Sequence, residues 1–245
     1  MKKYMIISVI LFFNLQINFS QINLGPASGF GDKNLGPLVD NAGSIDFQML
    51  SFHDKAKVFG VGTKEAKVKG SMFLYDNWNG YGVIQIAGKK FKLNNINFNI
   101  EQDAFMSKIG GDSVVVFDSN YIDDVKVNNR SFKYLYDSSK GKKKNFEVIH
   151  QLNDNLVLLK EYSLKVILAD PNSMLNRPID EIKKREKHVL YKDGELANFK
   201  LQKKNVLELI DSKKVKAVKD FVAKYDLSYK NQGHVVRILR YYNSL

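Results

Sequence analysis

Residues 146–168 read FEVIHQLNDNLVLLKEYSLKVIL, and this stretch decides the predicted fold class. Two apolar runs, Phe146–Leu152 and Leu156–Leu168, flank the turn-forming tripeptide Asn153-Asp154-Asn155. In the second run the apolar residues alternate, with Lys160 as the odd member: Leu156, Leu158, Tyr162, Leu164, Val166 and Leu168. A period of two is that of a strand with one buried face. The stretch therefore predicts a β-hairpin.

Further strands are predicted on both sides of this hairpin. Downstream, His188–Lys192 and Glu195–Leu201 flank Asp193-Gly194, a strong two-residue hairpin signal. Upstream, short alternating runs begin near residue 57 and include Lys90–Leu93, Ile96–Ile100 and Phe132–Tyr136. Residues that favour tight turns separate them: Asn79-Gly80, Gly88, Asn94-Asn95, Gly110-Gly111 and Asn128-Asn129. Closely spaced strands with short turns predict an antiparallel meander.

The end of the chain has helical periodicity. Lys203–Ile210 predicts a first helix, and a second follows Asp211 or Ser212 with apolar residues at steps of three and four. Gln232–Tyr242 predicts a third, well-buried helix. Helices this short are marginal alone in water, so we expect them to pack on each other or on the sheet.

The sequence thus predicts an α+β protein in four parts. Residues 1–20 form a signal peptide, 21–56 an irregular segment, 57–201 an antiparallel β domain and 202–245 a helical tail packed on it. We expect a single sheet, curled or partly closed into a barrel. Residues 169–187, with two prolines and a charged run, predict a loop with a helical turn. The lysines at 142–144 predict another loop, where the sheet could divide.

The first residues predict export. MKKYMIISVILFFNLQINFSQ has a basic start, an apolar middle that is short for a membrane span, and a polar exit, with cleavage expected after Ser20. We expect no transmembrane span in the mature chain. The chain has no cysteine, which excludes a lipidated N-terminal cysteine and any disulfide. The predicted location is the periplasm, the cell surface or the medium.

Charge is concentrated in the second half of the chain. Residues 140–245 contain 23 Lys/Arg and 13 Asp/Glu, so this part carries +10 of the chain's formal net charge of +12. A basic region favours an anionic partner, and export argues against nucleic acid. Anionic envelope lipid, an acidic glycan or a protein partner are the candidates. The alternative is a solvated lysine surface without a partner.

No catalytic constellation is recognisable. The four histidines show no HExxH spacing, and without cysteine we expect no metal site and no cofactor. His150 lies on an apolar strand face and is interpreted as a hydrogen-bonded core residue. Gly110-Gly111-Asp112-Ser113 lacks the lysine of a phosphate-binding loop. Asp123-Asp124 is interpreted as a turn with solvated charges, because neighbouring strand residues point to opposite faces.

An aromatic cluster is the one candidate binding feature. Tyr75, Trp78 and Tyr81 surround a turn in the sequence YDNWNGYG. Exposed aromatic side chains offer large rigid contact areas to a sugar or a protein. The alternative is that they fold back over the end of the sheet.

The leader, the hairpin FEVIHQLNDNLVLLKEYSLKV and the tail KKNVLELIDSKKVKAVKDFVAKYDLSYKNQGHVVRILRYYNSL resemble uncharacterised exported proteins of Bacteroidota. This resemblance implies location and architecture but no activity. These bacteria attach O-glycans at Asp followed by Ser or Thr and an apolar residue, and Asp112-Ser113-Val114 matches. The resemblance therefore implies Ser113 as a glycosylation site.

Three functions stay open at this stage. The leading hypothesis is a non-enzymatic envelope protein that binds a partner or an anionic component. The first alternative is a carrier of a small apolar ligand in a curled sheet, which requires a sizeable apolar pocket. The second is a hydrolase whose residues converge from distant strands. The sequence leaves the ligand and the oligomeric state undetermined.

Overall fold

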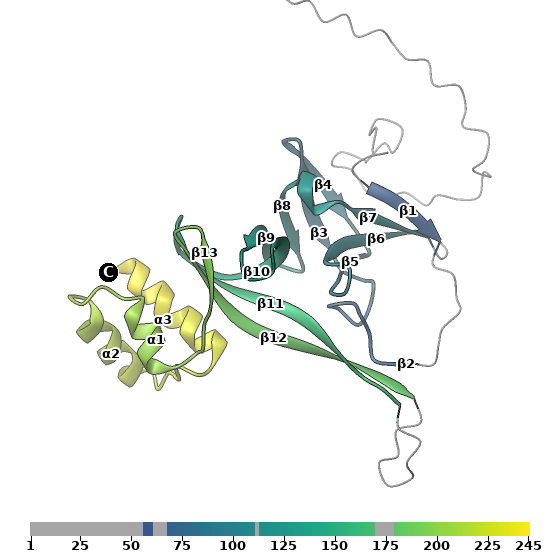
Figure 1. The fold of residues 1–245 in the computed structure, drawn as a ribbon. Coiled ribbons are helices and arrows are strands. Elements are labelled where there is room, and N and C mark those ends of the chain that lie inside the picture. Colours follow the sequence, from purple (N-terminus) through teal and green to yellow (C-terminus); the bar gives the residue numbers. More distant parts are fainter. Residues whose placement is uncertain (1–55, 61–67, 111–112, 170–178) are drawn as a thin grey trace, which may run out of the picture. The chain divides into compact units, whose positions relative to one another are not determined.

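The computed structural model describes residues 56–60, 68–110, 113–169 and 179–245 (Figure 1). The predicted signal peptide and nearly all of segment 21–56 lie outside these residues. The described chain forms two β-sheets followed by three C-terminal helices, which confirms the α+β class. None of its helices has the length and hydropathy of a membrane span.

The smaller sheet has four antiparallel strands in the order β1-β7-β6-β5. Its strands are β1 (Ala56–Gly60), β5 (Ile96–Asn99), β6 (Ala104–Gly110) and β7 (Ser113–Phe117). A 3₁₀ turn at Ser119–Tyr121 leads from β7 into the larger sheet. Asp118 caps this turn, because its side chain accepts a hydrogen bond from the backbone N–H of Asn120 at 2.9 Å.

The larger sheet has nine strands, mostly antiparallel, in the order β13-β12-β11-β10-β9-β8-β3-β4, with β2 pairing with β12. From β8 to β13 consecutive strands are neighbours, so the predicted meander is confirmed for this part. The strands are β2 (Val68–Lys69), β3 (Gly82–Ile86), β4 (Lys89–Leu93), β8 (Ile122–Val127), β9 (Arg130–Asp137), β10 (Lys142–Asn153), β11 (Leu156–Ile167), β12 (Asp180–Lys192) and β13 (Glu195–Asn198).

The prediction of one curled or barrel-like sheet is wrong. The chain builds two sheets, and the larger one is neither closed nor strongly curled: it runs from β13 at one end to β4 at the other. The strands β5 to β7 leave the larger sheet after β4 and return at β8. The apolar faces of two separate sheets then cover one another, which removes the need for closure.

Both predicted hairpins are confirmed. Strands β10 and β11 pair around the turn that begins after Asn153, and β12 and β13 pair around Asp193-Gly194. Asp193 and Gly194 have positive φ angles of 49° and 93°, as a tight hairpin turn requires. Asn128 and Asn129 also adopt positive φ, at 49° and 64°.

Two stretches predicted as loops form strands where the structure describes them; residues 170–178 of the first lie outside the described part. Strand β12 begins at Asp180 and pairs with β11 along its length, so the charged run up to Lys187 is neither loop nor helix (Figure 1). Lys142–Lys144 opens β10 and pairs with β9, so the sheet does not divide there. Strand β12 lies next to the edge strands β2 and β13, and a strand near a sheet edge keeps both sets of side chains close to water, so it does not need apolar alternation.

An apolar core lies between the two sheets. The rings of Phe98 and Phe105 are 4.9 Å apart, and that of Phe132 lies 5.2 Å from Phe105 in an edge-to-face arrangement. These rings come from β5, β6 and β9, so they join the sheets directly. The fully buried members around them include Ile84, Leu93, Ile96, Val115 and Val127.

Strand β5 has no solvent face, contrary to its sequence pattern. Asn97 and Asn99 are buried together with the neighbouring Ile96 and Phe98. The Asn97 side-chain amide forms hydrogen bonds with the backbone of Tyr75. Its Oδ1 accepts from the Tyr75 N–H at 3.1 Å, and its Nδ2 donates to the Tyr75 carbonyl at 2.8 Å. Buried amides are tolerated when they are bonded in this way.

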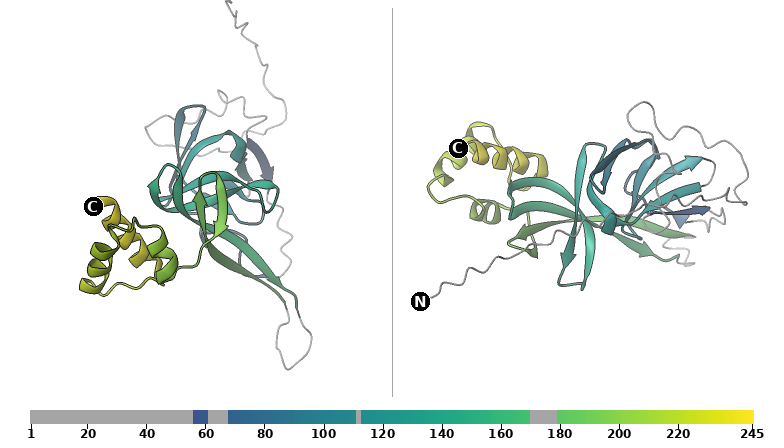
Figure 2. Two further views of the ribbon diagram at one scale, coloured as in Figure 1. Left: turned by 60° about the vertical axis from the view of Figure 1, so that its left-hand side comes forward. Right: turned by 90° about the horizontal axis from the view of Figure 1, so that it is seen from above.

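The three predicted helices are confirmed as α1 (Lys203–Glu208), α2 (Val215–Lys224) and α3 (Gln232–Ser244) (Figure 2). The side chain of Asn231 caps α3 by accepting from the backbone N–H of His234 at 3.1 Å. The helices share one apolar cluster with Leu158 and Phe199 of the sheet region. Its buried helical members include Val206, Ile210, Val218, Val235, Ile238 and Leu239.

Replacement of Phe105 tests the core between the sheets. Phe105→Ala removes a fully buried ring that contacts Phe98 and Phe132, so we expect it to lower the free energy of unfolding by about 3–5 kcal/mol. Urea unfolding followed by circular dichroism measures this. Tyr136→Ala, which shortens a side chain that is 57% exposed, should change stability by less than about 0.5 kcal/mol. Equal losses in the two variants would contradict a core at this place.

Candidate functional site

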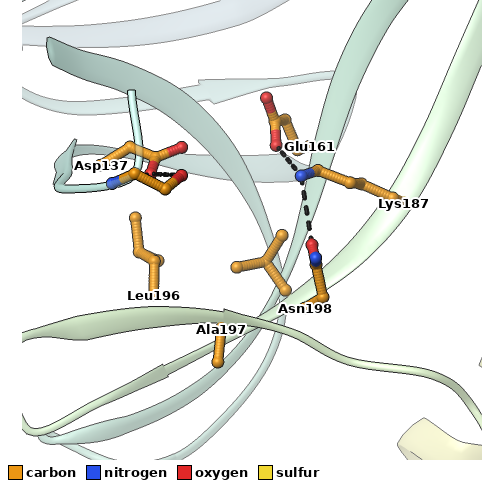
Figure 3. Close-up of a pocket in the computed structure, with 8 residues that line it drawn as sticks. Asp137, Glu161, Lys187, Leu196, Ala197 and Asn198 are labelled. Atoms are coloured by element: carbon orange, nitrogen blue, oxygen red, sulfur yellow. Dashed lines mark hydrogen bonds and ion pairs between the residues drawn. The ribbon is translucent and has the colours of Figure 1, made fainter. Parts of the chain in front are cut away.

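A buried carboxylate surrounded by lysines is the most unusual polar feature of the described residues. Glu161 lies on β11 opposite Lys187 of β12, and its side chain is only 3% exposed. Its Oε1 accepts a hydrogen bond from Lys144 Nζ at 2.6 Å and another from Lys140 Nζ. Its Oε2 lies 2.9 Å from Lys187 Nζ (Figure 3). Three strands and the β9–β10 turn therefore supply one cluster.

A small cleft opens beside this cluster. It has a volume of about 120 Å³ and is lined by Asp137, Ser139, Glu161, Lys187, Val189, Leu196, Ala197 and Asn198. Lys187 lies between Glu161 and Asn198, whose Oδ1 is 3.2 Å from Lys187 Nζ (Figure 3). Sites for small molecules usually measure about 300–1,000 Å³ and are mostly apolar. This cleft is smaller and polar, and thus lends no support to a carrier of an apolar ligand.

The cleft brings two carboxylates and a serine together, but their electrostatics do not favour catalysis. Burial raises the pKa of Glu161, yet hydrogen bonds from Lys140, Lys144 and Lys187 outweigh it and lower the pKa to about 2. Burial also raises the pKa of Asp137, while hydrogen bonds from Ser139 and Lys140 outweigh it and hold the pKa below its ordinary value. Carboxylates held ionised are weak bases, and a good general base has a pKa near the working pH.

The opposite face of the same strands holds a second buried polar group. Tyr162 on β11 donates a hydrogen bond to Glu147 Oε2 on β10, and Arg130 NH1 lies 3.2 Å from the Tyr162 hydroxyl. Burial, followed by the hydrogen bond to Glu147, raises the pKa of Tyr162. Beside it, Lys160 Nζ donates to Glu186 Oε2 at 2.7 Å. The charges on this face are therefore paired with one another.

Asp103 is a half-buried carboxylate between the two sheets. It lies in the β5–β6 turn with φ of 54°, and its Oδ2 accepts from the backbone N–H of Asn145 on β10 at 3.1 Å. The Asn145 amide returns a bond to the Asp103 carbonyl at 2.8 Å. Burial raises the pKa of Asp103 to about 6, against the lowering effect of the Asn145 N–H.

The C-terminal helices carry a second cationic region with a different environment. The ring of Phe221 stacks on that of Tyr241 with centroids 4.0 Å apart and an interplanar angle of 5°. The guanidinium of Arg237 lies 4.6 Å from the Tyr225 ring centroid, and Lys224 Nζ lies 5.4 Å from the same ring. We call these five residues the cation–aromatic surface. Tyr225 is 43% exposed, and Lys224 and Arg237 are also exposed.

The cations of the helices have few acidic partners. In residues 203–245, which the structure describes completely, helices α1–α3 contain one ion pair, Lys204 with Glu208 at 4.0 Å. Residues 202–245 contain ten Lys/Arg and four Asp/Glu. The sheet lysines differ, because Lys140, Lys144 and Lys187 share Glu161. Nine of the ten Lys/Arg in residues 202–245 are therefore in no ion pair among the described residues.

The three aromatic residues predicted as a binding cluster have different environments. Tyr75 is half-buried against the core, and its hydroxyl lies 3.3 Å from the Val127 carbonyl. Trp78 packs edge to face on Phe73 at 4.8 Å, with Lys108 Nζ 5.3 Å from its ring. Tyr81 is 50% exposed. Of the three residues, Tyr81 has the most exposed side chain, and binding through these residues stays a prediction.

Other residues singled out in the sequence have mixed outcomes. His150 on β10 is half-buried rather than in the core, with its Nε2 3.5 Å from Asn243 Nδ2, and burial lowers its pKa. Asp123 and Asp124 lie on strand β8, not in a turn, and both are exposed. Ser113 begins β7; its side chain lies outside the described part, and its glycosylation stays a prediction. Among the described residues, no group of three or more His, Asp or Glu side chains could hold a metal ion.

Sequence reasoning missed both cationic sites. The Glu161 cluster joins residues from β10, β11, β12 and a turn, and their pairing depends on strand register. The one local signal was the pair Lys160-Glu161 inside an otherwise apolar strand. In the helices, the spacing of Phe221 and Tyr225, and of Arg237 and Tyr241, places each pair on one helix face.

Comparison with protein-family models, with curated proteins and with solved structures finds no match to this chain. The site is therefore interpreted from its own geometry. The resemblance to exported proteins of Bacteroidota stays a prediction.

Replacement of Glu161 tests the lysine cluster. The pKa of the carboxyl is about 2 in the folded chain against an ordinary 4.5, so its contribution to stability is complete above about pH 4.5 and is lost as pH falls toward 2. We expect Glu161→Gln to cost about 2–3 kcal/mol at pH 7, because three ammonium groups lose their counter-charge. Urea titrations should show this difference shrinking at low pH. The exposed control Glu195→Gln should have little effect on stability. If Glu161→Gln also leaves the stability at pH 7 unchanged, the proposed role of the cluster is refuted.

Replacement of Asp103 is expected to change stability in the opposite direction. Its pKa of about 6 lies above the ordinary 3.8, so the half-buried charge costs stability above pH 6, and this cost disappears as pH falls from about 6 to 3.8. Asp103→Asn keeps an acceptor for the Asn145 N–H and tolerates positive φ. We expect the variant to be more stable by about 1–2 kcal/mol at pH 8 and to lose this advantage near pH 4. Thermal melts at the two pH values test this prediction, with the exposed Asp124→Asn as the control. A destabilised variant at pH 8 would show the prediction to be wrong.

Proposed function

We propose that this chain is an exported, non-enzymatic envelope protein that binds anionic lipid headgroups through the cation–aromatic surface of its helical tail. The observation that carries the proposal is that Lys224 and Arg237 lie over aromatic rings and lack an acidic partner among the described residues. The predicted leader supports export.

The contrast between the two cationic regions supports this choice of surface. The lysines around Glu161 are held by its buried carboxylate. If they bound another anion instead, the Glu161 charge would be left buried without a partner, which is costly. Lys224 and Arg237 instead lie beside ring faces and are in no ion pair among the described residues. A ring attracts a cation without neutralising it, so the full charge remains available to an anion.

The aromatic rings add a reason to expect a lipid headgroup. Tyrosine has an apolar ring and a polar tip, which suits the boundary between headgroups and acyl chains. A guanidinium binds phosphate through two parallel hydrogen bonds. Arg237 beside Tyr225 and the stacked pair Phe221–Tyr241 combines both properties on one surface. The surface is small, so we expect weak, salt-sensitive binding to a membrane that presents many headgroups.

Enzymatic and carrier functions have less support. The cleft at Glu161 holds Asp137, Ser139 and Glu161, but the serine hydroxyl donates to Asp137 in a local turn, and both carboxylates stay ionised. An activated serine instead donates to a base with a higher pKa. The small polar cleft also does not fit an apolar ligand.

Vesicle binding tests the proposed function. The mature chain should co-sediment with vesicles of phosphatidylcholine and phosphatidylglycerol but not with phosphatidylcholine alone, and binding should weaken at least tenfold between about 0.05 and 0.5 M NaCl. Lys224→Glu with Arg237→Glu should abolish the co-sedimentation. Circular dichroism confirms that the variant is folded, because both side chains are exposed.

A charge-matched control separates a surface from net charge. Lys89→Glu with Lys90→Glu changes the charge by the same amount on β4, where both side chains are exposed. This control should bind like the unaltered chain. Equal loss in both double variants would mean a net-charge effect. No binding to anionic vesicles would remove the lipid proposal.

A further inference from the structure

One side of β12 is open in the middle of the strand. At its start, β2 pairs with Asp180 and Glu181, and at its end β13 pairs with Val189 through Lys192. Among the described residues, no strand pairs with the segment Lys183–Lys187 on the side away from β11 (Figure 1). We call this segment the open edge of β12.

The backbone of the open edge points outward in a regular way. The His188 carbonyl accepts from the Phe199 N–H at 2.9 Å, on the side of β13. The Ile182 carbonyl faces Gly70 on the same side, so closely that a Cβ on Gly70 would lie 2.2 Å from it. In a strand, the N–H and C=O of alternate residues face the same neighbour. Lys184 and Glu186 therefore direct both backbone groups outward.

The side chains of the open edge set the charge of a matching strand. Lys183, Arg185 and Lys187 share one face, and all three are exposed. Arg185 has no ion pair among the described residues. Lys183 and Lys187 are each in an ion pair, but their side chains are still 55% and 49% exposed. Opposite charges on directly paired residues stabilise a sheet, and like charges destabilise it. A strand with acidic residues at alternate positions fits this face.

The cleft near Glu161 lies at one end of the open edge. Lys187 belongs to both, and Asn198 of β13 forms the far wall. Its volume of about 120 Å³ matches one side chain rather than a whole ligand. Strands that add to a sheet edge gain affinity from backbone bonds and specificity from such pockets.

We propose that the open edge of β12 accepts an extended acidic segment of a partner protein as an added strand. A second copy of this chain is a poor occupant, because pairing two open edges would bring two rows of Lys183, Arg185 and Lys187 together. This proposal is independent of the lipid proposal, since it uses neither α2 nor α3.

Synthetic peptides test the proposal on the full mature chain. The probe is a fluorescent eight-residue peptide with glutamate at alternate positions and valine or threonine between them. Fluorescence anisotropy should show saturable binding, at least tenfold tighter than that of the same peptide with lysine in place of glutamate. No saturable binding, or equal binding of the lysine peptide, overturns the proposal.

Backbone methylation shows whether the peptide binds as a strand. N-methylation of one alternate set of residues removes the N–H groups that face β12, and methylation of the other set removes those that face water. One of the two peptides should lose at least tenfold in affinity and the other should bind nearly unchanged. If neither loses affinity, the peptide binds by charge alone and the added strand is refuted.

Paired protein variants locate the site. Lys183→Glu with Arg185→Glu should weaken peptide binding at least tenfold, because both side chains are exposed on the proposed face. Lys224→Glu with Arg237→Glu, with the same change in charge, should leave peptide binding unaltered. The reverse is expected for vesicles, so failure of one proposal is distinguishable from failure of the other. Equal peptide affinity in all three proteins would place the peptide elsewhere and overturn the assignment.

Discussion

The burial of both faces of β11 from Val157 to Tyr162 is the constraint on which the rest of the structure depends. Leu158 belongs to the apolar cluster of the helices, Tyr162 to the core between the sheets, and Val157 and Leu159 to a third cluster with Phe146 and Val189. One strand thus anchors three groups of side chains. A chain without cysteine has no covalent link to hold these parts, so this shared strand must do so by packing.

The charged residues of β11 make this packing specific. Glu161 faces Lys187, and Lys160 bonds Glu186, so each charge has a partner only in the observed register. A slip of one residue would turn every side chain of β11 to the opposite face. It would place apolar residues beside the lysines and charges in the apolar clusters. Buried ion pairs contribute little net stability, and here they select one arrangement among several.

The sequence predicted what depends on local pattern. The hairpins around Asn153 and Asp193 and the three helices follow from alternation, turn residues and helical spacing. Burial of Asn97 and strand formation by Asp180–Lys187 were not predictable, because both depend on neighbours distant in the chain. The same holds for the lysines around Glu161, whereas the spacing of the helical aromatic residues is a local signal that the sequence contains.

The pairing of β2 with β12 has a consequence for the order in which the chain folds. Strands β8 to β13 pair with neighbours in sequence, and contacts of this kind form quickly. Val68, in contrast, pairs with Asp180, more than a hundred residues later. Among the described strands, β2 pairs only with β12, so this pairing must wait until β12 has been synthesised and has docked on β11. We infer that the second half of the chain serves as the template on which part of the first half completes its folding.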